Sequence, residues 1–220
     1  MSVAVEPPVS AADQRELPGW HAPPAPPRAA MAGRHCRLVP LDAGMHAAAL
    51  HAANSIDAEG RIWRYMAYGP FESMAAYTAW VAEKQRAADP LFFAIVDAAR
   101  DAPTGVASYL RIEPAQGVIE IGHLAFSPLL QRTPAATEAL YLMLRNVFER
   151  GYRRCEWKCN AANAASRSAA TRLGFTFEGV FRQHMVVKGR NRDTAWYSIL
   201  DREWPALRTG FERWLDPSNF

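Results

Sequence analysis

The sequence has 220 residues, of which half are hydrophobic and 21% are charged, and its formal net charge is +3. This is enough apolar material for a full core, and it excludes a chain that is disordered throughout. The sequence has no apolar run of about 18 residues that could cross a membrane, and no Lys/Arg block of the kind that marks nucleic-acid-binding tails. The mild positive charge suits an anionic ligand such as a nucleotide cofactor.

The cysteines indicate the redox setting. Of the three, Cys36, Cys155 and Cys159, the last two lie on a predicted strand at a spacing that separates them by roughly 13 Å. They can therefore neither form a disulfide nor share a metal ion. A sparse, odd set predicts a reducing, cytoplasmic setting. The first residues lack a basic region followed by an apolar stretch, so we expect no secretion signal.

The first 33 residues are rich in proline, with Pro-Pro at 7–8 and Ala-Pro-Pro-Ala-Pro-Pro at 22–27. Proline fixes φ and lacks a backbone donor, so residues 1–33 should form an extended arm without helix or sheet. Trp20 is unusual in this company. We expect it to anchor the arm to the globular domain or to a second subunit, which would make a homodimer; a solvent-exposed linker is the alternative.

From Arg34 onward the pattern becomes globular. Asp42 can cap a helix that runs through His51, and a second helix is predicted over residues 75–88. Strands are predicted at 37–40, 91–96, 104–112 and 118–127, with a tight turn at 114–117.

The best-defined helix follows the last of these strands. Its apolar residues between Leu140 and Phe148 recur at the spacing of one buried face. Thr133 is a candidate N-cap with Pro134 at the first helical position, and Gly151 should end the helix in the left-handed conformation.

The rest of the chain alternates strand and helix again. A strand at 154–159 is followed by a helix at 163–173, a hairpin of strands 175–188 and 193–200, and a terminal helix at 206–215. This order predicts a layered α/β (α+β) domain over residues 34–205, with a mainly antiparallel sheet and one βαβ crossover. Residues 206–220 would form a helical tail.

The strand-to-helix junction at 127–137 is a candidate phosphate site. Free backbone N–H groups and the helix dipole at such a junction attract a diphosphate. Ala135 and Ala136 are small enough to let phosphates approach, Thr133 and Thr137 add hydroxyl donors, and Arg132 adds charge. The alternative is an ordinary capped helix with nothing bound.

At this loop the sequence resembles a known family. Gln131-Arg132-Thr133-Pro134-Ala135-Ala136 is similar to the Gln/Arg-x-x-Gly-x-Gly/Ala loop of the GNAT acetyltransferases, whose amides hold the coenzyme A pyrophosphate. Pro134 replaces the first glycine and supplies no amide hydrogen, so one phosphate contact must be lost or moved.

A second stretch extends the resemblance. Asn163-Ala164-Ala165-Ser166, followed by Arg172-Leu173-Gly174-Phe175, resembles the Asn-x-x-Ser … Gly-Phe signature of the branch that acetylates the N-termini of ribosomal proteins (Rim-type). The similarity covers residues 119–200 well. It implies a GNAT fold with a mixed, mainly antiparallel sheet of six to seven strands and about four helices, and acetyl-CoA as co-substrate.

The resemblance also implies the cofactor-binding residues. They are Phe126, Ser127, Gln131, Arg132, Thr133, Ala135, Ala136, Thr137, Asn163, Ser166 and Arg172. Ser166 would place its hydroxyl near the cofactor sulfur and Asn163 would bind the pantetheine arm; a backbone-bonding helix start is the alternative for both.

Acetyl transfer to an amine needs a neutral amine, so a proton acceptor must be present. Glu120 is the first candidate, because strand alternation puts it where an apolar residue would be expected, and burial would raise its pKa. The alternative is a structural ion pair with an arginine. Glu156 is the second candidate and His184 the third; the family's glutamate near His184 is replaced here by Met185. A cysteine nucleophile is disfavoured.

The expected reaction transfers acetyl from acetyl-CoA to a primary amine by direct attack. The acceptor would be a protein N-terminus or a small amine, with Trp63, Tyr65, Tyr68 and Phe71 forming either its pocket or part of the core. A weakly catalytic acyl-CoA sensor or scaffold is the alternative function. We expect no membrane partner, and the loose basic patch of the last hairpin does not favour nucleic acid.

Overall fold

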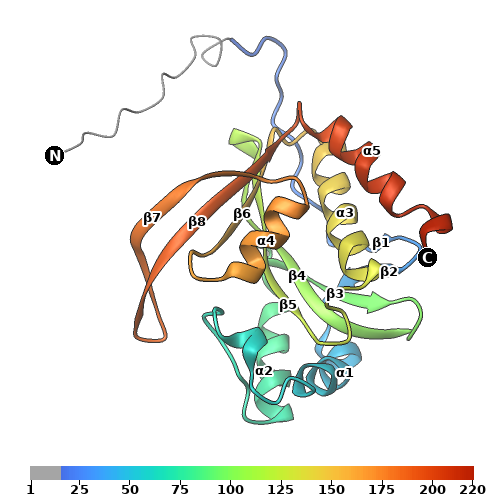
Figure 1. The fold of residues 1–220 in the computed structure, drawn as a ribbon, viewed down its shortest axis with the longest axis vertical. Coiled ribbons are helices and arrows are strands. Elements are labelled where there is room, and N and C mark those ends of the chain that lie inside the picture. The colour runs from blue at the N-terminus through green and yellow to red at the C-terminus, as the bar shows by residue number, and fades with distance from the viewer. Residues whose placement is uncertain (1–15) are drawn as a thin grey trace.

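The computed structural model describes residues 16–220. Its centre is one sheet with the strand order β1-β2-β3-β4-β5-β6-β8-β7 (Figure 1), in which only β5 and β6 run parallel. Within the described residues the strands are Met31–Ala32 (β1), Cys36–Pro40 (β2), Leu91–Asp97 (β3), Ala102–Glu113 (β4), Val118–Phe126 (β5), Arg154–Asn160 (β6), Thr176–Val187 (β7) and Arg190–Leu200 (β8). The α-helices are Ala43–Ser55 (α1), Met74–Lys84 (α2), Pro134–Glu149 (α3), Ala164–Arg172 (α4) and Trp204–Trp214 (α5).

This arrangement confirms the layered α/β class, the mainly antiparallel sheet and the single crossover, which is β5-α3-β6. The predicted counts of six to seven strands and about four helices were slightly low, since residues 16–220 contain eight strands and five α-helices. The additional strand is β1, which is only two residues long and lies inside the proline-rich arm. Met31 and Ala32 pair with Leu38 and Arg37 of β2 across a short turn. Two residues are too few to show an alternating pattern, so the arm contains a short strand where the sequence predicts no sheet.

The helix ends form where the capping residues predict them. Asp42 accepts a hydrogen bond from the Met45 amide, and Thr133 accepts one from the Ala136 amide. Each satisfies one of the donors that the first turn of a helix leaves free. Gly151 takes a φ of 90° just after α3, a conformation that costs glycine little.

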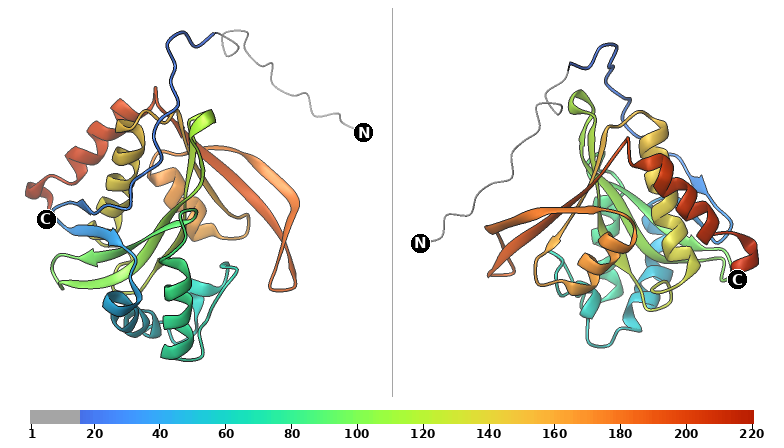
Figure 2. Two further views of the ribbon diagram at one scale, coloured as in Figure 1. Left: turned by 180° about the vertical axis from the view of Figure 1, so that it is seen from behind. Right: turned by 45° about the horizontal axis from the view of Figure 1, so that its top comes forward.

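Helices lie on both faces of the sheet (Figure 2), and each face has its own hydrophobic core. On one face α3 and α4 pack against the sheet and α5 packs on α3, with Leu140 and Leu144 among the buried side chains. On the other face α1 and α2 cover only β3, β4 and the far end of β5, through residues such as Leu50, Trp80 and Phe92. Of the helices in the described part of the chain, none lies on the part of this second face that is formed by β6, β7 and β8 (Figure 1).

The described part of the arm runs along the domain. A Cβ built at Gly117 would lie 3.3 Å from the Trp20 ring, so Trp20 packs against the turn before β5. Arg28 donates a hydrogen bond to the Ala87 carbonyl at 2.5 Å. No helix within residues 16–220 is long and apolar enough to cross a membrane.

Candidate functional site

The parallel strands β5 and β6 separate soon after they meet. Only Val118–Glu120 pairs with Arg154–Glu156, and beyond that rung no β5–β6 pair forms. The β4–β5 register shifts in the same region, and His123 takes a φ of 51° there. The C-terminal halves of β5 and β6 therefore diverge. We refer to the region between them as the β5–β6 opening.

The loop that leads from β5 into α3 has free donors. Arg132 adopts the left-handed conformation with a φ of 60°. Among residues 16–220, the backbone N–H groups of Arg132 and Thr133 have no acceptor. Together with the start of α3, these amides offer donors to an anionic group at the loop where the sequence predicts a phosphate site, and we refer to them as the predicted phosphate cradle. The residues present therefore fit a diphosphate.

The other predicted cofactor residues surround this loop. Gln131 turns its side-chain amide back to the Phe126 carbonyl at 2.8 Å. Arg172, at the end of α4, reaches Thr137 Oγ1 at 3.3 Å, which links the two helices that flank the loop. Ser127 is fully buried, so its hydroxyl does not face solvent and its role could only be structural or through the main chain.

An open pocket of about 590 Å³ lies along α4. Its lining consists of Ala164, Arg167, Ser168, Thr171, Arg172 and Tyr197. With two arginines and no carboxylate, the lining suits the phosphates of a nucleotide.

At the start of α4 the structure brings Asn163 and Ser166 together. The Asn163 side chain accepts from the Ser166 amide at 3.1 Å, which makes it the N-cap. Ser166 Oγ accepts from the Trp157 indole N–H at 3.0 Å. Because an indole can only donate, the hydroxyl proton of Ser166 is left for an acceptor in the opening or for the weakly accepting Cys159 sulfur nearby.

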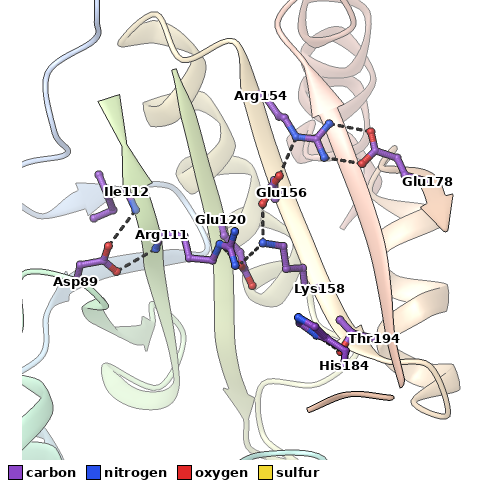
Figure 3. A network of polar contacts seen from close by, with 10 residues as sticks. All are labelled: Asp89, Arg111, Ile112, Glu120, Arg154, Glu156, Lys158, Glu178, His184 and Thr194. Atoms are coloured by element: carbon purple, nitrogen blue, oxygen red, sulfur yellow. Dashed lines mark hydrogen bonds and ion pairs between the residues drawn. The ribbon is translucent and has the colours of Figure 1, made fainter. Parts of the chain in front are cut away.

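The two glutamates predicted as candidate bases meet around one lysine (Figure 3). Lys158 Nζ lies 3.1 Å from Glu120 Oε2 and 2.7 Å from Glu156 Oε2, and all three side chains are buried. Glu156 also accepts from Arg154 at 2.9 Å, whereas Arg111 approaches Glu120 only to 3.7 Å. Glu120 is thus part of an ion pair, with a lysine rather than an arginine as its nearest partner.

The two carboxylates have different proton affinities. Burial raises the pKa of Glu120, and the positive charges of Lys158 and Arg111 oppose this only in part. Burial also acts on Glu156, but hydrogen bonds from Lys158 and Arg154 lower its pKa overall. Glu120 is therefore the better proton acceptor of the two.

His184, the third candidate base, lies on β7. Its side chain is exposed, and Nδ1 lies 3.0 Å from Thr194 Oγ1. No hydrogen bond or ion pair joins it to Glu120 among the described residues, so it is not part of the carboxylate network (Figure 3).

Sequence reasoning missed two residues at the opening. His123, on β5, lies 3.2 Å from the Tyr68 hydroxyl and stacks on its ring. Burial, together with the charges of Lys84 and Arg192, lowers the pKa of His123 to about 4. The second is Arg192, considered below. Both are single polar residues in strands, and only the neighbouring elements reveal their burial.

The predicted aromatic cluster divides into two parts. Trp63 is buried, and with Tyr68 and Phe71 it packs in the core beneath α1 and α2, as the core interpretation predicts. Tyr65 is partly exposed, and its hydroxyl reaches the Ala162 carbonyl at 3.1 Å. Lys188 Nζ, at the tip of the β7–β8 hairpin, donates to the Trp63 carbonyl at 2.9 Å. The loop between α1 and α2 is therefore tied to both the β6–α4 loop and the hairpin.

The cysteines do not suit nucleophilic catalysis. Cys36, Cys155 and Cys159 are free and buried, and burial raises the pKa of each thiol. A thiol with a raised pKa contains little of the reactive thiolate at neutral pH.

Comparisons with known proteins show the family of the chain. The family model described as "Acetyltransferase (GNAT) domain" matches residues 35–176. The chain is 48% identical to a GCN5-related N-acetyltransferase from Brucella melitensis, with 93% of each chain covered and a TM-score of 0.91. It is 44% identical to a probable acetyltransferase of the GNAT family from Chromobacterium violaceum, with 91% of this chain and 100% of that chain covered and a TM-score of 0.83. A search of curated proteins gave no significant match.

More distant structures share the fold. One, from Vibrio cholerae, is provisionally described as a ribosomal-protein-serine acetyltransferase; it has 16% identity, a TM-score of 0.67 and coverage of 78% of this chain and 97% of that chain. Another is the microcin C7 self-immunity acetyltransferase MccE in complex with acetyl-CoA and AMP, with 21% identity, a TM-score of 0.67 and coverage of 76% and 93%. The family match and the two similar structures settle the classification. The chain belongs to the GNAT family and is an acetyl-CoA-dependent N-acetyltransferase.

Proposed function

We propose that the chain acetylates a primary amine by direct attack, with Glu120 as the proton acceptor. The observation that carries the proposal is the position of Glu120. It is a buried carboxylate with a raised pKa at the last rung before β5 and β6 separate. Acetyl-CoA supplies an activated acyl group and a thiolate leaving group when bound.

The roles of the side chains follow from what each can donate or accept. Glu120 takes a proton from the incoming ammonium, which frees the nitrogen lone pair to form the C–N bond as the C–S bond breaks. Ser166 is positioned to donate its hydroxyl hydrogen bond to the departing sulfur, since its oxygen already accepts from Trp157. Lys158 keeps the two glutamates from repelling each other.

Two features support binding of acetyl-CoA at the cradle and along α4. The amides of Arg132 and Thr133 are free, and the pocket beside α4 contains Arg167 and Arg172. Asn163 holds the start of α4 next to Ser166.

The acceptor class is a separate question. The Rim-type resemblance predicts a protein N-terminus, but its structural support is the Vibrio cholerae protein at 16% identity, a level that speaks for the fold alone. A small amine is the other candidate, and the next subsection argues for one kind of small amine.

The test is the turnover of acetyl-CoA with a panel of amines, measured by the release of the coenzyme A thiol. We expect Glu120→Gln to lower kcat by about 10²–10⁴-fold, the scale of a lost general base, while the Kd for acetyl-CoA measured by calorimetry stays unchanged. The acidic limb of kcat/KM should disappear in the same variant. Because burial raises the pKa of Glu120, that limb in the wild type should lie above the range of an ordinary glutamate.

Glu178→Gln is the matched control, because Glu178 belongs to the far end of the same network, where it pairs with Arg154. It should leave kcat within a few-fold of wild type. A large loss in Glu156→Gln but not in Glu120→Gln would move the base to Glu156. Tight binding of acetyl-CoA without turnover of any amine would favour the sensor function.

A further inference from the structure

Arg192 is a half-buried cation without a counter-ion. Its side chain belongs to β8, and no carboxylate among residues 16–220 lies within 4.0 Å of its guanidinium. The other buried cations of this face are paired: Arg154 with Glu156 and Glu178, and Lys158 with Glu120 and Glu156. Removing a charge from water without a partner costs free energy, and burial accordingly lowers the pKa of Arg192.

The guanidinium is held in a fixed orientation. Arg192 Nε donates to Thr194 Oγ1 at 3.2 Å, and the Thr194 side chain is almost fully enclosed. The same hydroxyl lies 3.0 Å from His184 Nδ1, so it can accept from the arginine and donate to the histidine. With Nε occupied, both terminal amino groups of Arg192 are without an acceptor among residues 16–220. A planar fork of two donors matches a carboxylate or a phosphate.

Arg192 lies on the catalytic face of the sheet. Directly paired residues in an antiparallel ladder share a face, and the β6–β8 register pairs Glu156 with Ser198, Lys158 with Trp196, and Asn160 with Thr194. Arg192 is two residues before Thr194 and so points to the same side. Figure 3 shows Thr194 and His184 on that side, together with Glu120 and Lys158.

Arg192 interacts electrostatically with groups on both sides of the β5–β6 opening. Its charge is one of those that lower the pKa of His123 on β5, and Cys159 on β6 and Glu120 on β5 in turn act on the pKa of Arg192. The predicted phosphate cradle includes the start of α3, and α3 packs together with α4 on the other face of the sheet. Arg192 therefore does not belong to that cradle. An anion that it binds would approach from the face of the sheet that carries Glu120, where the acceptor amine would lie.

We propose that Arg192 binds an anionic group of the acceptor, so that the substrate is a small amine with a carboxylate or a phosphate close to its amino group. This inference rests on the proposed function and deepens it. An acceptor of this kind brings the missing counter-ion with it, while its ammonium is attracted to the carboxylate of Glu120. A peptide N-terminus without a nearby acidic group would leave Arg192 unpaired.

The experiment compares matched acceptors that differ only in the anionic group. One series pairs α-amino acids with their decarboxylated amines, and a second pairs aminoalkyl phosphates with the corresponding amino alcohols. We expect the wild type to favour the anionic member by at least about tenfold in kcat/KM, the scale of one charge-assisted pair. The series with the larger ratio identifies the group as carboxylate or phosphate.

Arg192→Gln should abolish this preference by raising KM for the anionic member. The kcat/KM for the neutral member and the Kd for acetyl-CoA should stay within about threefold of wild type. Arg190→Gln, which removes an exposed charge from the same strand, should keep the preference. Arg192→Lys keeps the charge but not the planar fork of donors, so its preference for the anionic member should lie between that of wild type and that of Arg192→Gln. Equal turnover of both members by the wild type, or an equal loss on both in Arg192→Gln, would overturn the proposal.

A binding measurement separates this proposal from the proposed function. Calorimetry of CoA-saturated protein with inorganic phosphate and with acetate needs no turnover. Weaker anion binding in Arg192→Gln than in Arg190→Gln supports the anion site even if no amine is acetylated. Anion binding that is equal in wild type and Arg192→Gln contradicts it, whatever the activity.

Discussion

His123 shows how the pKa of one side chain depends on its surroundings. It lies against Tyr68 and Phe92, and its pKa is lowered to about 4, first by burial and then by the charges of Lys84 and Arg192. At neutral pH the ring is therefore uncharged. A protonated histidine here would add a second buried cation beside Arg192, which the site could not compensate.

This pKa predicts a dependence of stability on pH. Between about pH 6.5 and pH 4 the unfolded chain binds a proton at His123 that the folded chain does not, so the free energy of unfolding falls as the pH drops through this window. A shift of this size corresponds to a loss on the order of 3 kcal/mol. Urea unfolding across the window should show a smaller loss in His123→Gln than in the wild type.

The comparison uses the difference between variant and wild type, because other groups titrate in the same range. Glu120, with its raised pKa, contributes in the opposite direction. His21→Gln, in the exposed part of the arm, controls for the loss of a histidine. Parallel curves for wild type and His123→Gln would show that His123 is accessible to protons in the folded state.

The residue scale also shows what the sequence can and cannot predict. Glu120 was found because a carboxylate interrupts the apolar alternation of a strand. Lys158 and Arg192 stand in strands where charged residues are common, and the sequence does not reveal which of them the neighbouring strands enclose. Whether a buried charge is paired depends on contacts between β5, β6 and β8, which the local pattern does not encode.

At the scale of elements, one side chain joins the N-terminal strands to α3. The buried carboxylate of Glu138 accepts from the backbone amides of Arg34, His35 and Cys36 at 2.8, 2.6 and 2.8 Å. A Cβ at Gly33 would collide with the same carboxylate, so the close approach of the chain requires glycine there. These bonds fix the segment between β1 and β2.

Glu138→Gln should therefore destabilise the fold. One acceptor oxygen becomes an NH₂ group that faces backbone donors, and an unsatisfied buried donor costs about 1–3 kcal/mol. Thermal or urea unfolding measures the loss. Glu149→Gln, an exposed position on the same helix that faces Arg208 at 3.5 Å, should change stability by less than about 1 kcal/mol. Equal effects in both variants would mean that the segment is held by other contacts.

The elements themselves were largely predictable, and for a physical reason. β3 is an unbroken apolar run and α3 has caps at both ends, so local sequence and tertiary packing favour the same structure. β1 was missed because two residues carry no periodicity. α5 was predicted to begin at residue 206 but starts at Trp204 with Pro205 in its first turn, and Phe211 packs it against Tyr141 of α3.

For the whole molecule, the β5–β6 opening divides the sheet into two halves. In the half from β1 to β5, α3 covers one face, and α1 and α2 cover the β3-β4-β5 part of the other. Within residues 16–220 the β6-β8-β7 half is covered by α4 on one face only. Contacts that join the two halves include the Glu120–Lys158 ion pair, the Tyr65–Ala162 hydrogen bond and the Lys188–Trp63 hydrogen bond. A ligand that bridges the two halves should therefore stabilise the molecule beyond its local contacts.

Hydrogen exchange with and without acetyl-CoA tests this expectation. A ligand at 100 times its Kd stabilises the folded state by about 2.7 kcal/mol, and this protects every amide that exchanges through global unfolding. Segments 122–137 and 157–172 should gain additional protection, because they flank the β5–β6 opening. When the ligand is absent, their amides exchange through local unfolding. The exposed turn at 98–100, between β3 and β4, serves as an internal reference and should change little. Protection that is uniform along the chain, or confined to α5, would contradict binding between the two halves and would place acetyl-CoA elsewhere.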